Sequence, residues 1–252
     1  MSSGWRNFLL RNIGQSSLFL IRNKKNKKKI TRQYLLMFIS VFIAGCSLKP
    51  SVKIDERQYK NQTVWKQSNP RIKKFVQVYS KNNHVKICLN RASSKRYLNY
   101  IHRVFYKYKL PPELAHLPIL ESCFDTKADS GHARGMWQFT RSTGEEYGLS
   151  VGIFSDERLN WRKATHSAAR YLKKLGDMFN RNWELALAGY NGGPNYMKRQ
   201  MESQGTGNFW KLKLRKETHE YVPKFLAMLK VARNKYPEMY FQGAPRAWAS
   251  SS

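Results

Sequence analysis

Apolar side chains recur at the spacing of an α-helix along much of the chain, and this periodicity limits the possible folds more than any other feature. The pattern predicts helices over residues 97–108, 111–121, 161–179, 183–190 and 218–236. No segment shows the alternation of apolar and polar residues that is typical of a strand, and no internal repeat is visible. The sequence therefore predicts a mainly α fold.

The predicted helix over residues 111–121 contains an internal proline. Pro111 and Pro112 suit the first turn of a helix. Pro118 lies deeper, and it has no N–H to donate to the carbonyl of Leu114. We therefore expect a kink or an irregular turn just before Glu121, the last residue of this helix.

The front of the chain has the pattern of an export signal. Residues 1–45 contain nine Lys and Arg residues and no acidic residue, and an apolar run over residues 34–43 is shorter than a typical membrane span. Ile43-Ala44-Gly45-Cys46 resembles the lipobox of bacterial lipoproteins, in which the cysteine is lipidated. We predict a lipoprotein-type signal peptide over residues 1–45 and lipidation of Cys46. The alternatives are a weak membrane anchor with an incidental cysteine, or a buried helix.

Three further segments are predicted after the signal peptide. Residues 46–74 are polar, contain Pro50 and Pro70, and are interpreted as a tether, with a short helix inside it as the alternative. Residues 75–240 hold the helical patterns and form the predicted folded domain. Residues 241–252 are short and polar and are interpreted as a disordered tail.

The net charge predicts an anionic partner. The chain has 46 Lys and Arg residues against 16 Asp and Glu residues, a formal net charge of +30, and loss of the nine basic residues in 1–45 would leave +21. Charge of this size attracts nucleic acid, anionic lipid or an acidic polymer without selecting among them.

An exported chain would also place Cys88 and Cys123 in an oxidising compartment. They can form a disulfide if their Cα atoms lie within about 7 Å, or they can be two unpaired buried cysteines. The sequence leaves both possibilities open.

Several classes of site are missing from the sequence. It has no P-loop, no GxGxxG motif, no spaced cysteine cluster and no nucleophile elbow. His219-Glu220 begins like a zinc-protease helix, but Pro223 stands where the second histidine is required. We therefore expect neither a metal nor a cofactor.

One carboxylate has an unusual position. Glu121 ends a helix with apolar neighbours that include Ile119, Leu120 and Phe124. Burial against apolar surface raises the pKa of a glutamate, and this allows a carboxylic acid to serve as general acid on a glycosidic oxygen. The alternative is an ordinary glutamate at a helix end, paired with a lysine.

Short motifs that follow this glutamate resemble the lytic transglycosylases of the soluble-lytic-transglycosylase (SLT) type, most of all the membrane-bound murein transglycosylase D branch. The resemblance covers roughly residues 111–236. The motifs are, in chain order, Glu121-Ser122-Cys123-Phe124-Asp125, Gly135-Met136-Trp137-Gln138-Phe139, Ser142-Thr143-Gly144 with Tyr147-Gly148-Leu149, Ala186-Leu187-Ala188-Gly189-Tyr190-Asn191, and Glu217-Thr218 with Tyr221-Val222-Pro223-Lys224.

The resemblance implies a lysozyme-like helical domain with a cleft for the glycan strand of peptidoglycan. Glu121 matches the single catalytic glutamate of the family. In the family's reaction this residue protonates the oxygen between N-acetylmuramic acid and N-acetylglucosamine. It then takes the proton of the muramyl 6-hydroxyl, which closes to a 1,6-anhydro sugar. A hydrolase that uses water typically needs two carboxylates instead of one.

The resemblance also implies substrate contacts. Gln138 and Asn191 would bind acetamido and hydroxyl groups, Tyr190 would orient Glu121 or the N-acetyl group, and Trp137 would stack on a sugar or pack in the core. Glu217 and Tyr221 would close the cleft from the last helix, although Glu217 also suits the positive end of a helix dipole. The predicted substrate-binding residues are Ser130, Met136, Trp137, Gln138, Tyr190, Asn191, Glu217 and Tyr221.

Three departures from the family pattern are present, two of them in the loop after Glu121. The family pattern is one residue longer than this chain from Phe124 to Gly135, which shifts Ser130 from the usual serine position. His132 stands where the family commonly has Gly or Asn, and Arg215 where it commonly has Pro. Asp125 stands where the family has Asn or Asp, so local hydrogen bonding is favoured over a second catalytic carboxylate.

The resulting prediction is a monomeric peptidoglycan lytic transglycosylase, lipid-anchored in the bacterial envelope and facing the periplasm, most simply from the outer membrane. Its partners are glycan strands and the membrane, not nucleic acid. The alternatives are a muramidase-type hydrolase and a catalytically idle peptidoglycan-binding scaffold.

Overall fold

A computed structural model describes residues 67–237 of the chain. The predicted signal peptide, Cys46, most of the predicted tether and the predicted tail lie outside the described residues. None of the helices within 67–237 is long and apolar enough to cross a membrane.

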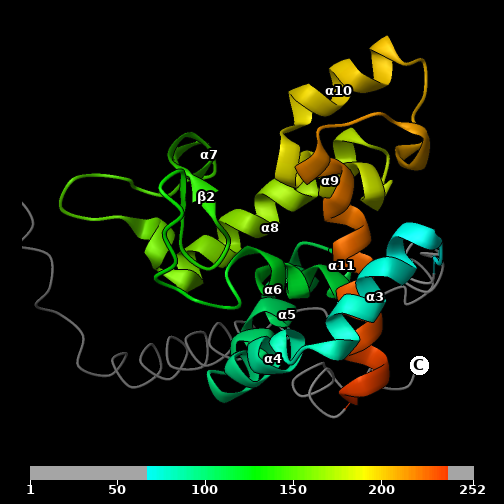
Figure 1. Cartoon of the computed structure of the whole chain (residues 1–252). Helices are drawn as coiled ribbons and strands as arrows, with labels where there is room; N and C mark the ends of the chain where they lie inside the picture. Colours follow the sequence, from blue (N-terminus) through cyan, green and yellow to red (C-terminus); the bar gives the residue numbers. More distant parts are fainter. Residues whose placement is uncertain (1–66, 238–252) are drawn as a thin grey trace, which may run out of the picture. The chain divides into compact units, whose positions relative to one another are not determined.

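The described residues are mainly helical, as predicted (Figure 1). The longer helices are α3 (Pro70–Lys81), α4 (His84–Ser94), α5 (Tyr97–Lys107), α8 (Trp161–Met178), α9 (Trp183–Gly192), α10 (Pro194–Ser203) and α11 (Lys216–Lys235). Shorter pieces are η2 (Pro112–His116), α6 (Leu117–Glu121), α7 (Arg141–Glu146), η3 (Glu157–Leu159) and η4 (Phe209–Lys211). Strands β1 (Ala133–Arg134) and β2 (Phe139–Thr140) pair antiparallel in a short hairpin.

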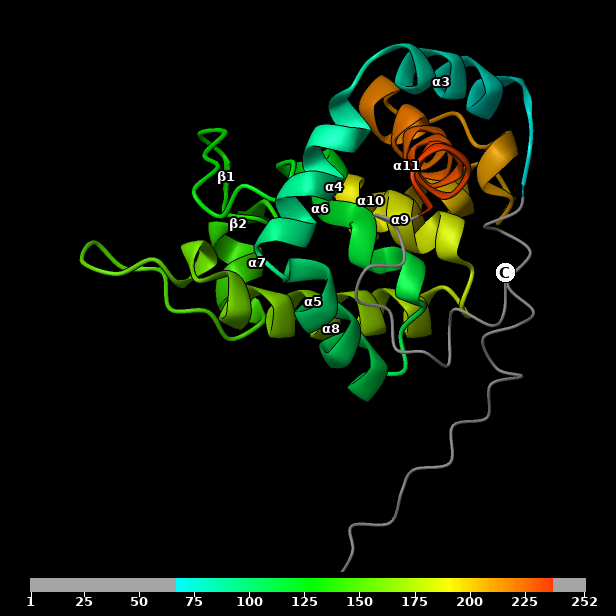
Figure 2. The ribbon, with the colours of Figure 1, turned by 90° about the horizontal axis from the view of Figure 1, so that it is seen from below.

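Helix α11 is buried on several sides because α3 and α9 pack against it. Figure 2 looks along α11 and shows α3 and α9 beside it. The side chains of Val222, Phe225 and Met228 are completely buried. Helix α11 therefore packs against several helices, with further contacts to α4 and α6.

The folded domain begins before residue 75, the predicted boundary. Asn69 caps α3 by accepting a hydrogen bond from the Ile72 N–H at 3.0 Å, and Pro70 occupies the first turn. Ile72, in the first turn of α3, is buried, and this helix packs on α11. The end of the predicted tether is thus part of the fold. The proline that suggested a linker instead begins a helix.

The predicted helix over residues 111–121 is divided, as Pro118 required. Residues Pro112–His116 form the 3₁₀ helix η2, and α6 then begins at Leu117 with Pro118 in its first turn, where no N–H is needed. The division sets the direction in which α6 presents Glu121.

A disulfide joins Cys88 in α4 to Cys123, with 4.8 Å between the Cα atoms. This answers the question that the sequence left open. The bond ties α4 to the segment that directly follows Glu121.

The β1–β2 hairpin is attached to α8 by a buried hydrogen bond. The Trp137 indole N–H donates to the Thr165 hydroxyl oxygen at 3.1 Å, and both residues are completely buried. The hydroxyl in turn donates to the carbonyl of Trp161 at 2.7 Å.

We expect Thr165→Val to lower the free energy of unfolding by about 1–3 kcal/mol, because the buried indole N–H loses its acceptor while the side-chain volume is kept. Urea denaturation of both proteins measures this difference. Thr165→Ser, which retains the hydroxyl, is the matched control and should lose less. Equal losses in the two variants would contradict the role given to this hydrogen bond.

Candidate active site

Glu121 stands at the end of α6, where the chain turns back sharply. Ser122 and Phe124 both donate backbone hydrogen bonds to the carbonyl of Pro118, at 3.0 and 3.1 Å. Cys123 and Phe124 have φ values of 53° and 58°, in the left-handed region that non-glycine residues seldom adopt. Buried Phe124 and the disulfide hold this turn in place.

The Glu121 carboxyl group is partly protonated near neutral pH. Burial raises the pKa of Glu121 to about 7; the hydrogen bond from Tyr221 acts against this rise, and the nearby charge of Glu217 adds to it. The residue as a whole keeps part of its surface exposed. A protonated, partly accessible carboxyl group is the form that a general acid requires.

Tyr221 of α11 is the hydrogen-bond partner of this carboxyl group. Its hydroxyl donates to Glu121 Oε1, and the tyrosine ring is buried. Burial and the charge of Glu121 raise the pKa of Tyr221 well above its ordinary value, so the phenol remains protonated and remains a donor. The sequence predicted that Tyr221 closes the site from the last helix, but not that it contacts Glu121.

Asn191 and Glu217 form a second polar pair beside this centre. The Asn191 side-chain amide donates to Glu217 Oε1 at 2.9 Å. The amide oxygen of Asn191 is buried and has no hydrogen-bond partner among the described residues. Glu217 is exposed, and its charge acts on Glu121. The pair therefore combines an unused acceptor with a carboxylate held in a fixed position.

Tyr190 supports the site through the backbone. Its hydroxyl donates to the carbonyl of Trp137 at 2.7 Å, which links α9 to the turn between β1 and β2. Burial, followed by the charge of Glu121, raises its pKa well above the usual value. The rings of Tyr171 and Tyr190 lie 5.3 Å apart, and those of Tyr147 and Tyr171 lie 4.9 Å apart. Tyr171, which packs on Tyr190, was not among the predicted site residues, and none of the motifs in the sequence includes it.

Two predicted substrate contacts are corrected by burial. The side chains of Met136 and Trp137 are both completely buried, so neither can present a face to a sugar. Their carbonyl groups instead accept hydrogen bonds from the hydroxyl groups of Ser122, at 2.8 Å, and Tyr190. Trp137 therefore packs in the core, which was the alternative interpretation of this residue.

Ser130 and Gln138 are held within the hairpin segment. The exposed Ser130 hydroxyl donates to the carbonyl of Ala133 at 3.2 Å. The Gln138 amide donates to the carbonyl of Gly135 at 3.0 Å, and its backbone is left-handed at φ 46°. Neither residue has a hydrogen bond to Glu121 in the structure of residues 67–237.

Gly135 allows this segment to approach η3 closely. It has a φ of 77°, and a Cβ atom there would lie 1.9 Å from the carbonyl oxygen of Arg158. Only glycine fits such a contact. The glycine before Met136 therefore has a structural function.

Asp125 makes the local hydrogen bond that was predicted for it. Its carboxylate accepts from the Lys127 backbone N–H at 2.9 Å. Asp129 is paired with Arg134 at 2.7 Å on the hairpin. The acidic side chain that acts on the pKa of Glu121 is therefore Glu217, which was not proposed as a second catalytic carboxylate.

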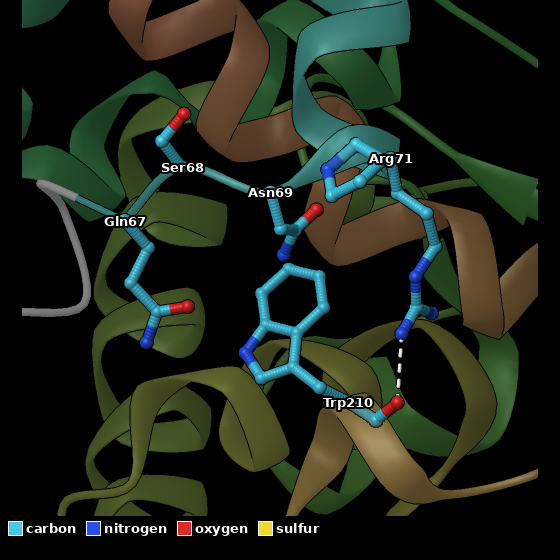
Figure 3. Close-up of a pocket in the computed structure, with 6 residues that line it drawn as sticks. Gln67, Ser68, Asn69, Arg71 and Trp210 are labelled. Carbon is cyan, nitrogen blue, oxygen red and sulfur yellow. Dashed lines mark hydrogen bonds between the residues drawn. The ribbon is translucent and has the colours of Figure 1, made fainter.

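A cavity of about 480 Å³ lies elsewhere, between the start of α3 and η4 (Figure 3). Arg71 donates to the carbonyl of Trp210 at its edge, at 2.8 Å. None of the predicted site residues lines this cavity, which is bordered by Gln67, Ser68, Asn69, Pro70, Arg71 and Trp210. We therefore place the candidate site at Glu121.

His84 lies close to the two disulfide cysteines, and together their side-chain atoms fall within 4.8 Å of one another. Three such groups can bind zinc when the cysteines are thiolates. Here Cys88 and Cys123 are bonded to each other, so neither is available as a thiolate ligand.

The comparison with known proteins agrees with the resemblance. Residues 99–213 match the family described as Transglycosylase SLT domain. Membrane-bound lytic murein transglycosylase D of Escherichia coli K12 is 37% identical over 172 residues, which are 66% of this chain and 38% of that protein; the protein from a second E. coli strain gives the same values. The chain thus spans less than half the length of these curated relatives.

A solved structure of an inactive mutant of lytic transglycosylase Slt from Pseudomonas aeruginosa is also similar. It has 21% sequence identity and a TM-score of 0.42, and the match covers 57% of this chain and 24% of that chain. On the sequence match, residues 99–213 of this chain are similar to the transglycosylase SLT family.

Proposed function

We propose that this protein is a peptidoglycan lytic transglycosylase in which Glu121 is the catalytic acid and base. The observation that carries the proposal is the state of Glu121, whose pKa is raised to about 7 at a partly exposed position with a tyrosine hydroxyl beside it. The resemblance of the Glu121-Ser122-Cys123-Phe124-Asp125 motif to the family implies that this glutamate is the catalytic one. Relatives named lytic murein transglycosylase support the same activity.

The reaction uses the carboxyl group twice. Protonated Glu121 gives its proton to the glycosidic oxygen between N-acetylmuramic acid and N-acetylglucosamine, and the C1–O bond breaks. The resulting carboxylate takes the proton of the muramyl 6-hydroxyl, whose oxygen bonds to C1. The product is a 1,6-anhydro ring, and Glu121 is protonated again. No water enters, so a single carboxylate is sufficient.

The neighbouring residues hold this centre in place. Tyr221 donates to the carboxylate that forms after the first proton transfer. Tyr190 fixes the Trp137 carbonyl, so Trp137 and Met136 contribute through their backbone. We propose that Asn191 holds Glu217 in place beside the glycan, and that Glu217, Gln138 and Ser130 contact the glycan more peripherally.

Digestion of isolated peptidoglycan tests this proposal. The purified chain should release soluble muropeptides, while sedimentation with intact peptidoglycan and no release would favour an idle scaffold. A muramidase is the second candidate. A hydrolase that uses water needs a second carboxylate, and Glu217, whose charge acts on Glu121, would supply it. Reducing ends among the products would identify that enzyme.

The pH dependence of cleavage should shift in opposite directions in two variants. Activity should fall as the pH rises through about 7, because Glu121 then loses its proton. This fall is the alkaline limb of the pH profile. Glu217→Gln removes a like charge, which lowers the pKa of Glu121 and moves this limb to lower pH. Tyr221→Phe removes a hydrogen bond to the carboxylate, which raises the pKa and moves the limb to higher pH.

The profile of kcat/KM against pH measures these limbs in the free enzyme. Glu202→Gln, which replaces an exposed acid in α10, is the matched control and should leave the limb in place. Shifts of the same sign in Glu217→Gln and Tyr221→Phe would contradict the assignment of the limb to Glu121.

We also propose that the protein is a monomer anchored in the cell envelope by lipid on Cys46, most simply on the outer membrane and facing the periplasm. Support comes from the basic and apolar leader, the lipobox-like residues and the membrane-bound relatives. In the proposed arrangement, residues 46–66 link the anchor to the domain. The basic surface of the domain holds the enzyme near the carboxylates of peptidoglycan.

Lipid labelling tests the anchor. Cells that express the full chain should incorporate a labelled fatty acid into it, and Cys46→Ala should abolish the incorporation. Ser47→Ala is the matched control and should remain labelled. Continued labelling of Cys46→Ala would remove Cys46 from the account.

A further inference from the structure

The loop between α7 and η3 carries two fully exposed apolar side chains. Ile153 and Phe154 have exposed fractions of 96% and 102%, far above the 55% of Ile87 and the 47% of Val78. Figures 1 and 2 both show this loop extending away from the helices. Solvation of two adjacent apolar side chains at one tip is unfavourable, so the tip is suited to a contact that removes them from water.

The base of the loop is firmly held. Val151 and Asp156 form a β-bridge, and the Gly152 N–H donates to the carbonyl of Ser155 at 2.8 Å. Arg141 donates to the carbonyl of Val151 at 2.7 Å from α7.

A second set of contacts fixes the return of the chain to the domain. The Asp156 carboxylate pairs with buried Arg158 at 2.6 Å. The Ser150 N–H donates to a carboxylate oxygen of Glu157 at 2.8 Å. The domain therefore presents the apolar tip on a braced support, which keeps the tip from folding back onto the core.

The size of the tip favours a bilayer over a protein partner. Stable protein interfaces bury more than about 1,000 Å² in total, and two side chains supply only a small part of that area. A bilayer interface accepts inserted Ile and Phe side chains without a matching surface, and binding grows with the apolar area that enters it.

The charge of the domain favours an anionic bilayer. Residues 67–237 contain 31 Lys and Arg residues against 13 Asp and Glu residues. Arg162 and Lys163 are exposed at the start of α8, which follows the loop in the chain. Basic side chains near an anionic leaflet add to membrane attraction. The chain between Cys46 and Gln67 spans at most about 70 Å when extended, which is enough for a domain anchored at Cys46 to contact the same membrane.

We propose that the tip formed by Ile153 and Phe154 inserts into the interface of an anionic bilayer and sets the orientation of the domain on the membrane. This contact is separate from the catalytic proposal and does not depend on it. Burial of an Ile or Phe side chain changes a partition constant by about ten- to a hundredfold, so the two together make a substantial contact.

Spin-label accessibility tests the proposal at the level of single positions. The full chain with Cys46→Ser and Ile153→Cys is labelled with a nitroxide and mixed with vesicles of phosphatidylethanolamine and phosphatidylglycerol. The apolar run over residues 34–43 is common to all variants, so differences among them report the domain. On addition of vesicles, the label at position 153 should become several-fold less accessible to a water-soluble nickel complex and more accessible to oxygen.

Matched variants make the result specific. A label at Ser203→Cys, exposed at the end of α10, should keep its accessibility. Phe154→Ser in the Ile153→Cys protein should abolish the vesicle effect, whereas Ile87→Ser, at another exposed apolar residue, should preserve it. Equal changes at positions 153 and 203, or no change at 153, would overturn the proposal. Immobilisation of the 153 label without vesicles at raised protein concentration would also overturn it, in favour of contact with a second copy.

The catalytic proposal is tested independently. Ile153→Ser combined with Phe154→Ser should leave cleavage of isolated, lipid-free peptidoglycan unchanged, because neither residue is part of the site at Glu121. Loss of that cleavage in the folded variant would instead assign the tip to the glycan and overturn the membrane contact.

Discussion

Replacement of Glu121 by glutamine is expected to reduce glycan cleavage by about a thousandfold or more. A glutamine side chain has nearly the same shape but cannot give its proton to the glycosidic oxygen or take one from the 6-hydroxyl. General acid–base catalysis contributes about a hundred- to ten-thousandfold to enzyme rates, and here one group performs both transfers. Release of muropeptides from isolated peptidoglycan by wild type and Glu121→Gln measures the loss.

The stability of the same variant distinguishes a lost catalyst from a lost fold. The pKa of Glu121 is about 7 in the folded protein, above the value of 4.5 for an ordinary glutamate, so the folded state binds this proton more tightly. The associated stability is complete below pH 4.5 and is lost as the pH rises to about 7, a change on the order of 3 kcal/mol. Glu121→Gln has no such loss.

The variant should therefore be more stable than wild type above pH 7, while the difference shrinks or reverses near pH 4. Urea denaturation at the two pH values measures this. A folded Glu121→Gln protein that retains more than about a tenth of wild-type activity would contradict the catalytic assignment, which requires a proton at this position. A variant that is less stable than wild type at every pH would contradict the raised pKa.

Removal of the disulfide is expected to lower the free energy of unfolding by about 4 kcal/mol. Cys88 and Cys123 are separated by 35 residues in the sequence, and a cross-link over a loop of this length restricts the unfolded chain by about that amount. Urea denaturation of Cys88→Ala combined with Cys123→Ala, compared with wild type under oxidising conditions, measures the loss. Cleavage activity should also fall, because Cys123 lies in the left-handed turn directly after Glu121.

Reduction provides the matched control. Dithiothreitol should destabilise wild type to about the level of the double variant and should leave the double variant unchanged. Equal effects of the reductant on both proteins, or a loss below about 1 kcal/mol in the double variant, would show that the bond does not brace this part of the fold.

The helices that carry the site were predictable because their apolar residues are strongly periodic. The predicted 161–179 and 218–236 correspond closely to α8 and α11, and the effect of Pro118 follows from its missing N–H. Helix α10 was missed because its apolar face is short: Met197 is its one buried residue, and Tyr196 and Met201 are partly buried beside it. Helix α4 was also missed, although buried Val85, Cys88, Leu89 and Ala92 have helical spacing.

The position of Glu121 was predictable from local sequence, but its partners were not. Apolar neighbours and a helix end indicate a raised pKa. The contact with Tyr221 joins residues a hundred positions apart and depends on how α11 crosses α6. Burial of Trp137 likewise depends on α8, because Thr165 supplies the acceptor for its indole N–H. Motifs show which residues gather at a site, whereas tertiary packing decides which side chains face it.

The central claim is that Glu121 catalyses closure of an anhydro ring without attack by water. Digestion in water labelled with oxygen-18, the heavy oxygen isotope, tests it most directly. Mass spectrometry of the muropeptides should find 1,6-anhydromuramyl ends that contain no heavy oxygen, made by wild type and not by Glu121→Gln. Reducing muramyl ends that carry one heavy oxygen would show that water attacks C1, and would contradict the account in favour of a hydrolase.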